Sequence, residues 1–148
     1  MQVMLSNFNI SVELPNEGQL IDSTRYAKSG WAPYMLFAYS LPHATLTGTR
    51  GKMEIIDDIH ELVNFNLRQI LLKGYKTTLV KKVSNNTDYY VLVEKDNSRV
   101  LQTYFYFKEH FYSISATFKD NKVIDLRKIK KLDLYHMLKD VVQSIKKN

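Results

Sequence analysis

The sequence contains no cysteine among its 148 residues. Disulfide bonds, thiolate nucleophiles and thiolate metal sites are therefore excluded. Glycine and proline are also scarce, with five and three residues, which excludes collagen and the common kinds of low-complexity chain. The longest uncharged run, residues 29–49, is interrupted by Gly30, Pro33 and Pro42. We therefore predict no membrane span.

In place of such features, the chain has the composition of an ordinary globular domain. Hydrophobic residues make up 45% of the sequence and charged residues 24%, and there are seven phenylalanines and ten tyrosines. A chain of this size buries roughly 70% of its unfolded surface, so it needs no metal or disulfide to fold. We predict one domain over residues 1–148, and we expect neither a cofactor nor a metal. Residues 1–7 lack the basic start and apolar run of a secretion signal, so the expected location is the cytoplasm.

Basic residues are concentrated in the second half of the chain. The net charge is +6; residues 1–74 contain six basic and seven acidic residues, whereas residues 75–148 contain 15 and 8. Such a concentration can attract an acidic partner or a phosphate, and the candidate residues for this steering are Arg127, Lys128, Lys130 and Lys131. The alternative is a solvated helix face. Because single-strand binders usually add exposed aromatic residues to a basic track, nucleic acid is not the expected partner.

Hydrophobic patterns in the first third of the chain predict three strands. Residues 8–14 alternate between apolar and polar side chains and stop before a proline, which indicates a strand followed by a turn. The short apolar and aromatic run 34–41 is typical of a strand that is buried on both sides. A loop containing Gly48 and Gly51 is expected next, followed by a short strand over 52–56.

A helix is predicted over residues 58–73. Asp58 and Glu61 have the spacing of a capping box at its start, and Gly74 supplies a left-handed stop at its end. The residues at helical spacing that form its mostly apolar stripe are Ile59, Leu62, Val63, Asn66, Ile70 and Leu71.

Four strands are predicted after this helix, and the connections between them are short. Because short connections join antiparallel neighbours, the strands should form a meander. Their expected ranges are 76–83, 89–95, 100–108 and 111–118.

Both faces of the predicted meander carry almost no charge in its middle strands. In the third strand, Leu101 and Phe105 point to one face, while Tyr104 and Tyr106 point to the other. A face in contact with water would carry charged residues, so we infer cover on both faces. A terminal amphipathic helix over 131–147 supplies part of it. The predicted fold is α+β, in the order strand–strand–strand–helix–four-strand meander–helix, with helices on both faces of an antiparallel sheet as an α/β/α sandwich.

This order of elements resembles the PsbP-like family. The resemblance depends on Leu14-Pro15 after the first strand, on Gly74-Tyr75-Lys76 after the helix, and on the segments 88–91, 102–106 and 111–118. It implies a fold shared with the PsbP subunit of photosystem II, a Ran-binding nuclear import factor, the periplasmic protein DcrB and the chaperone-adaptors of type VI secretion. Most such proteins bind other proteins without catalysis. The resemblance therefore implies an adaptor or chaperone-like role, and it transfers no functional residue.

The expected partner is another protein or a second copy of the chain. Tyrosine and tryptophan give large contact areas at low entropic cost, so aromatic residues on the sheet face and in the preceding loop are the candidate contacts. They are Trp31, Tyr34, Tyr39, Tyr104 and Tyr106.

Two other functions stay open from the sequence. A long helix before a curved meander also suits a cystatin-like or nuclear-transport-factor-like cone, which can hold a small ligand or perform acid–base chemistry. Binding of nucleic acid by the basic half is the second. The sequence has no nucleophile elbow and no phosphate-binding glycine loop, so we predict no catalytic residue and expect the chain not to be an enzyme.

Overall fold

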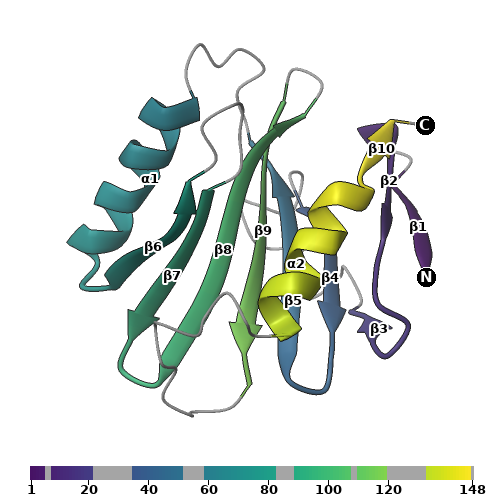
Figure 1. Ribbon diagram of the computed structural model, residues 1–148, viewed down its shortest axis with the longest axis horizontal. Helices are drawn as coiled ribbons and strands as arrows, with labels where there is room; N and C mark the ends of the chain where they lie inside the picture. The colour runs from purple at the N-terminus through teal and green to yellow at the C-terminus, as the bar shows by residue number, and fades with distance from the viewer. Residues whose placement is uncertain are drawn as a thin grey trace.

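The computed structural model describes residues 1–5, 8–21, 35–51, 59–82, 89–107, 110–119 and 133–147. Within these ranges the fold is mixed α+β, with two helices and antiparallel strands in two sheets (Figure 1). The larger sheet has seven strands in the spatial order β3-β4-β5-β9-β8-β7-β6, and the smaller has three in the order β1-β2-β10.

The strands of the larger sheet are β3 Gln19–Leu20, β4 Met35–Ser40, β5 Ala44–Arg50, β6 Lys76–Lys82, β7 Tyr89–Lys95, β8 Ser98–Phe107 and β9 His110–Phe118. The smaller sheet contains β1 Gln2–Leu5, β2 Ile10–Glu13 and β10 Lys146–Lys147, and the helices are α1 Ile59–Leu72 and α2 Asp133–Ser144.

The predicted four-stranded meander is present as β6 to β9, and each strand pairs with the next in antiparallel register. The turn between β7 and β8 shows why β8 begins earlier than expected. Asp96 has a φ of 51°, a conformation that suits a two-residue hairpin turn and that aspartate tolerates. The turn lets Ser98 pair directly with Lys95, so β8 starts at Ser98.

The loop predicted around Gly48 is wrong, because this segment is strand β5. Ala44 and Leu46 are buried while Thr45 and Thr47 are partly exposed, and β5 pairs with β4 on one side and β9 on the other. Gly48 is needed for packing: a Cβ atom there would lie 2.5 Å from the Phe37 ring. The strand predicted over 52–56 lies outside the described residues.

The predicted helix after this strand is confirmed as α1. Gly74 adopts a φ of 90° just beyond its end, which is the left-handed stop that the sequence indicates. Lys95 Nζ donates a hydrogen bond of 2.9 Å to the carbonyl oxygen of Lys73, which satisfies one of the free carbonyl groups at the helix end. The Asp58 cap lies outside the described residues.

The terminal helix is shorter than predicted, because α2 ends at Ser144 and the chain then forms β10. Lys146 and Lys147 pair with Ser11 and Ile10 of β2. The sequence pattern of this segment is helical, but the pairing with β2 decides its conformation. β1 and β3 were not predicted either, and the part of the chain that the structure describes has five strands before α1.

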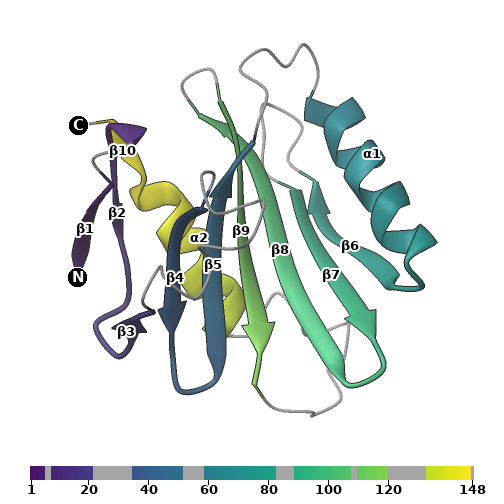
Figure 2. The same ribbon diagram turned by 180° about the vertical axis from the view of Figure 1, so that it is seen from behind.

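Two hydrophobic clusters occupy alternate positions along the central strands. Tyr90 and Leu92 of β7 belong to a large cluster with α2, whereas Val91 and Val93 belong to a smaller cluster with Val63 of α1. In the two opposite views, α2 lies in front of the larger sheet (Figure 1) and then behind it (Figure 2).

Cover of the sheet is uneven on the side of the smaller cluster. Thr45 and Thr47 of β5 and Ser113 and Ser115 of β9 stand beyond this cluster and are partly exposed. The complete α/β/α sandwich therefore stays a prediction.

Candidate interaction surface

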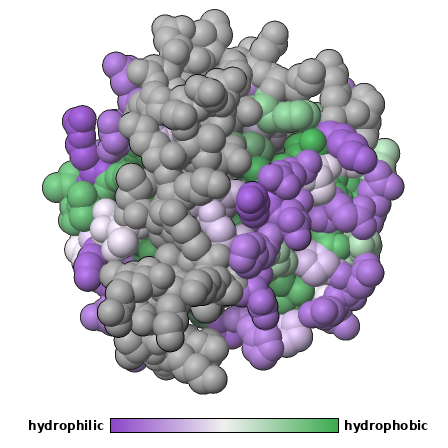
Figure 3. Space-filling view, viewed as in Figure 1, coloured by the Kyte–Doolittle hydropathy of each residue, from purple (hydrophilic) through white to green (hydrophobic). Residues whose placement is uncertain are grey.

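Three large apolar side chains are exposed on the outer side of α1. The exposed fractions are 56% for Phe65, 52% for Leu71 and 81% for Leu72. Phe65 and Leu72 are seven residues apart, so they lie on the same face of the helix, and Leu71 lies about 100° around the helix axis from Leu72, at the side of that face. We call these three residues the α1 patch. Green atoms mark its side of the molecule at the left rim of the space-filling view (Figure 3).

The opposite side of α1 holds the helix on the sheet. Val63 is 1% exposed and belongs to the cluster with β7 and β8, and Leu67 and Ile70 pack against the same cluster. Leu71 was placed in this inward stripe by its spacing, and its exposure corrects that assignment. Because Val63, Leu67 and Ile70 already make the tertiary contacts of α1, the fold does not require the α1 patch.

Basic residues in the C-terminal half of α1 and after its end give the α1 patch a basic border. Arg68 is three residues after Phe65 and four before Leu72, so its side chain is next to both on the helix surface. Arg68, Lys73 and Lys76 are all exposed. Glu61 is the exposed acidic residue at the other end of α1. The border should therefore favour a partner with acidic residues.

Tyr104 was predicted to contact a partner, but the structure places it in the core. Its side chain is 5% exposed and stacks on Phe111, with ring centroids 5.8 Å apart. The hydroxyl donates a hydrogen bond to Gln102 Oε1. Burial raises the pKa of Tyr104 to about 12, because the ionised form loses its hydration. Tyr104 therefore stabilises the α1 side of the sheet.

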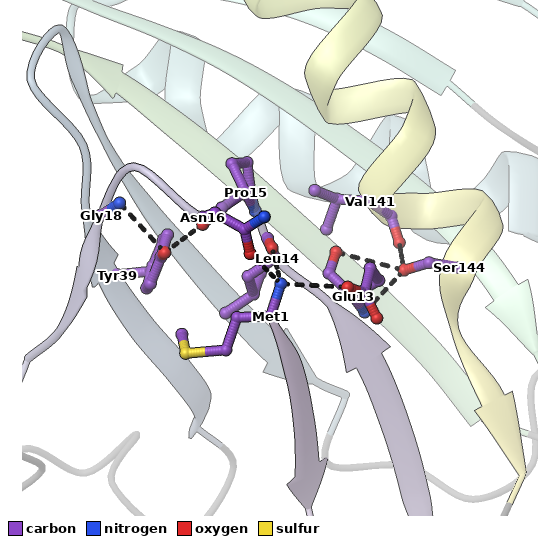
Figure 4. Close-up of polar contacts among 9 residues, drawn as sticks. All are labelled: Met1, Glu13, Leu14, Pro15, Asn16, Gly18, Tyr39, Val141 and Ser144. Atoms are coloured by element: carbon purple, nitrogen blue, oxygen red, sulfur yellow. Dashed lines mark hydrogen bonds and ion pairs between the residues drawn. The ribbon is translucent and has the colours of Figure 1, made fainter.

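Tyr39 is likewise a core residue, with an exposed fraction of 0%. Its hydroxyl donates a hydrogen bond to the carbonyl oxygen of Pro15 and accepts one of 3.1 Å from the amide of Gly18 (Figure 4). The ring in β4 thus fixes the loop between β2 and β3. Neither Tyr39 nor Tyr104 presents contact area to a partner in this conformation.

The other predicted site residues are not described in full. Tyr106 pairs with Phe111 through the β8 backbone, and its side chain lies outside the described residues. The remaining candidates, Trp31, Tyr34, Arg127, Lys128, Lys130 and Lys131, also lie outside them. Of the predicted contact residues, the structure describes the side chains of Tyr39 and Tyr104 alone, and both are buried. Phe65 and Leu72 were not among the residues predicted from the sequence.

A cationic group lies against an aromatic ring at the end of β5. The Arg50 guanidinium is 4.7 Å from the centroid of the Phe8 ring, and Arg50 is the register partner of Tyr112 in β9. Burial raises the pKa of Tyr112, and the nearby positive charge of Arg50 lowers it in part. Arg50 thus joins the segment before β2 to the larger sheet.

Hollows at the periphery of the described fold include the following two. One, of about 390 Å³, is between the β2 end and α2, and it combines the carboxylates of Glu13 and Asp140 with the apolar side chains of Leu14, Met137 and Val141. Within it the amino group of Met1 donates hydrogen bonds of 3.0 Å to Glu13 Oε1, 2.8 Å to the Leu14 carbonyl and 2.6 Å to Asn16 Oδ1 (Figure 4). The other, of about 570 Å³, is open to solvent beside the β7–β8 turn.

No protein-family model matches this chain. A search of the curated proteins also finds no match. The resemblance to the PsbP-like family therefore stays a prediction. In the described part of the chain, neither helix has both the length and the apolar character needed to cross a bilayer.

Proposed function

We propose that this chain is a non-catalytic binding domain, adaptor or chaperone-like, that holds a segment of another polypeptide on the α1 patch. The observation that carries the proposal is the exposure of Phe65, Leu71 and Leu72 on a helix whose inner side already packs on the sheet. Large apolar side chains gathered on one exposed surface are typical of sites of protein contact. The PsbP-like resemblance of the sequence implies the same class of function.

The chemistry of the α1 patch suggests the kind of segment it binds. Apolar side chains of the segment would cover Phe65 and Leu72, and acidic residues beside them would face Arg68 and Lys73. The proposal moves the binding surface from the sheet face, where Tyr104 is buried, to the outer side of α1. The role of Arg127 and its neighbouring lysines in steering an acidic partner stays a prediction.

A peptide array tests this proposal. We expect the protein to bind synthetic peptides that combine large apolar residues with Asp or Glu more strongly than peptides of the same apolar content with Lys. The double substitution Phe65→Ala and Leu72→Ala should weaken binding at least about tenfold, because each buried side chain contributes about 1.5–3 kcal/mol.

Leu20→Ala is the matched control, because Leu20 is 50% exposed and lies on β3 at the other edge of the sheet. It should leave peptide affinity unchanged. Equal losses in the control and the double variant, or no peptide bound by the wild-type protein, would refute the proposal.

The alternative function, binding of a small ligand or acid–base chemistry, stays a prediction. An NMR titration of the same protein can test it. The pKa shifts resolved in the described residues are upward shifts of Tyr104 and Tyr112, so neither hydroxyl is brought closer to ionisation near neutral pH. A cone-type site would need its acid and base elsewhere. Chemical-shift changes on addition of a small-metabolite library would favour this alternative.

A further inference from the structure

β1 is an edge strand with an uncharged and largely apolar sequence. In the smaller sheet β1 pairs with β2, at the end of the order β1-β2-β10. Both views place it at the outer limit of the molecule, beyond β2 (Figures 1 and 2). Met4 is 62% exposed, and Gln2 is exposed on the same face of the strand. Such a strand leaves backbone hydrogen-bonding groups available for another strand.

The other outer strands of the two described sheets have the usual protection against pairing. β6 contains Lys76, Lys81 and Lys82, and charge on an edge strand opposes association. β3 and β10 have two residues each, which is too short to guide a long pairing. Among these strands, β1 has neither protection.

Charge favours a second copy of the chain as the occupant of β1. The chain has a net charge of +6, so two copies repel each other at most surfaces. Antiparallel pairing of β6 with its own copy would bring lysines of the two chains together. Residues 2–5 have no ionisable side chain, and the nearby amino group of Met1 is paired with Glu13 of its own chain at 3.0 Å. Self-pairing of β1 therefore brings no like charges together.

Symmetry restricts how two β1 strands can pair. Antiparallel pairing of identical strands requires a two-fold axis perpendicular to the sheet, and this axis keeps each side chain on the same face in both copies. Directly opposed residues share a face, whereas sequence neighbours lie on opposite faces. A residue of β1 therefore cannot stand opposite its sequence neighbour in the second copy, and one residue of β1 must stand opposite its own copy. Val3 and Leu5 pack against the large core cluster, so they form the inner face.

Pairing of Met4 with Met4 satisfies this restriction best. It sets Val3 opposite Leu5 of the second copy, which continues the apolar inner face from one chain to the other. It also covers the exposed Met4 side chain of each copy with the other. The alternative register, with Val3 opposite Val3, would set Gln2 against Met4.

We propose that this protein forms a symmetric homodimer in which the two β1 strands pair antiparallel, with Met4 on the two-fold axis. The smaller sheets of the two copies join into one continuous sheet. This surface is separate from the α1 patch, so the proposal does not depend on the proposed function.

Cysteine cross-linking is a direct test, because the natural sequence contains no cysteine. In the variant Met4→Cys the two thiols would face each other, with Cα atoms about 4.5–5.5 Å apart, within the range of a disulfide. Mild oxidation should convert this variant to a covalent dimer. Gln2→Cys is the matched control, since Gln2 has the same outward orientation but does not meet its own copy in either register.

Sedimentation of the unmodified protein over a wide concentration series gives the second measurement. We expect the mass of two chains at high concentration, and Met4→Lys should raise the dissociation constant about tenfold or more by placing like charges together. Leu72→Lys, at a site on α1 that is 81% exposed, should leave the dimer intact.

Three results would overturn the proposal. They are a single-chain mass at every concentration, a dimer that Met4→Lys does not weaken, and equal cross-linking of Met4→Cys and Gln2→Cys. A dimer that Leu72→Lys dissociates would locate self-association at the α1 patch instead.

Discussion

The hydroxyl of Ser144 accepts a hydrogen bond of 2.9 Å from the backbone amide of Glu13, which is 131 residues earlier in the chain. The same hydroxyl donates one of 2.6 Å to the carbonyl oxygen of Val141 (Figure 4). Ser144 is the last residue of α2, and Glu13 is the last residue of β2. This contact therefore holds the end of the terminal helix on the smaller sheet, at the point where the chain turns into β10.

Ser144→Ala should lower the free energy of unfolding by about 1 kcal/mol, because it removes the hydrogen bonds of the hydroxyl while water can reach the exposed groups. Chemical denaturation at neutral pH measures the change. Gln143→Ala is the control, since Gln143 is exposed on the same turn of α2 and should change stability by less than about 0.5 kcal/mol. Equal effects of the two substitutions would show that the contact with Glu13 does not stabilise the fold.

Gly48→Ala should destabilise the protein by about 1–3 kcal/mol, as expected for overpacking in a filled core. The new Cβ atom would lie 2.5 Å from Cε1 of the Phe37 ring, so the ring must move. Adding Phe37→Leu should recover part of the loss, and a double-mutant cycle of unfolding free energies measures the coupling. Purely additive effects would indicate that Gly48 does not make room for Phe37.

The raised pKa of Tyr104 predicts a loss of folding stability in alkaline solution. Its pKa is raised from 10.0 to about 12 in the folded protein, so the folded state favours the protonated hydroxyl. The resulting stabilisation is complete below pH 10, falls as the pH rises, and is lost above about pH 12. Tyr104→Phe should reduce this alkaline decline in a pH series of unfolding free energies.

A smaller alkaline decline of the unfolding free energy should persist in Tyr104→Phe, since burial raises the pKa of Tyr112 as well. Identical declines in the wild-type protein and in Tyr104→Phe would contradict the assignment. A spectroscopic titration of the tyrosines gives an independent check, because the wild-type protein should show one late-ionising tyrosine that is missing from the variant.

Local patterns were sufficient to predict α1 and the meander. Gly74 marks the end of α1, and short polar turns separate strands whose apolar positions alternate. β5 was missed because Gly48 and three threonines resemble a loop, and only the packing of Phe37 explains the glycine. β10 was missed because its lysines are equally suited to a helix end, and a contact with the opposite end of the chain decides their conformation.

Contact residues are harder to predict from the sequence than helices and strands, for a physical reason. Aromatic type alone does not distinguish Tyr39, whose hydroxyl finds partners inside the fold, from a tyrosine that faces water. The signal for the α1 patch was available, because Phe65 and Leu72 fall outside the inward stripe of a predicted amphipathic helix. The openness of the β1 edge depends on the strand order, which the sequence does not reveal.

The two faces of β7 have a consequence for mutational tolerance. All five residues from Tyr89 to Val93 are buried, alternately under α1 and under α2, so every side chain in this run lies in one of the two cores. A strand of this kind has no position that accepts a polar replacement without desolvating it. Its amide protons should be among the last in the protein to exchange with deuterium, since their release requires both cores to open together.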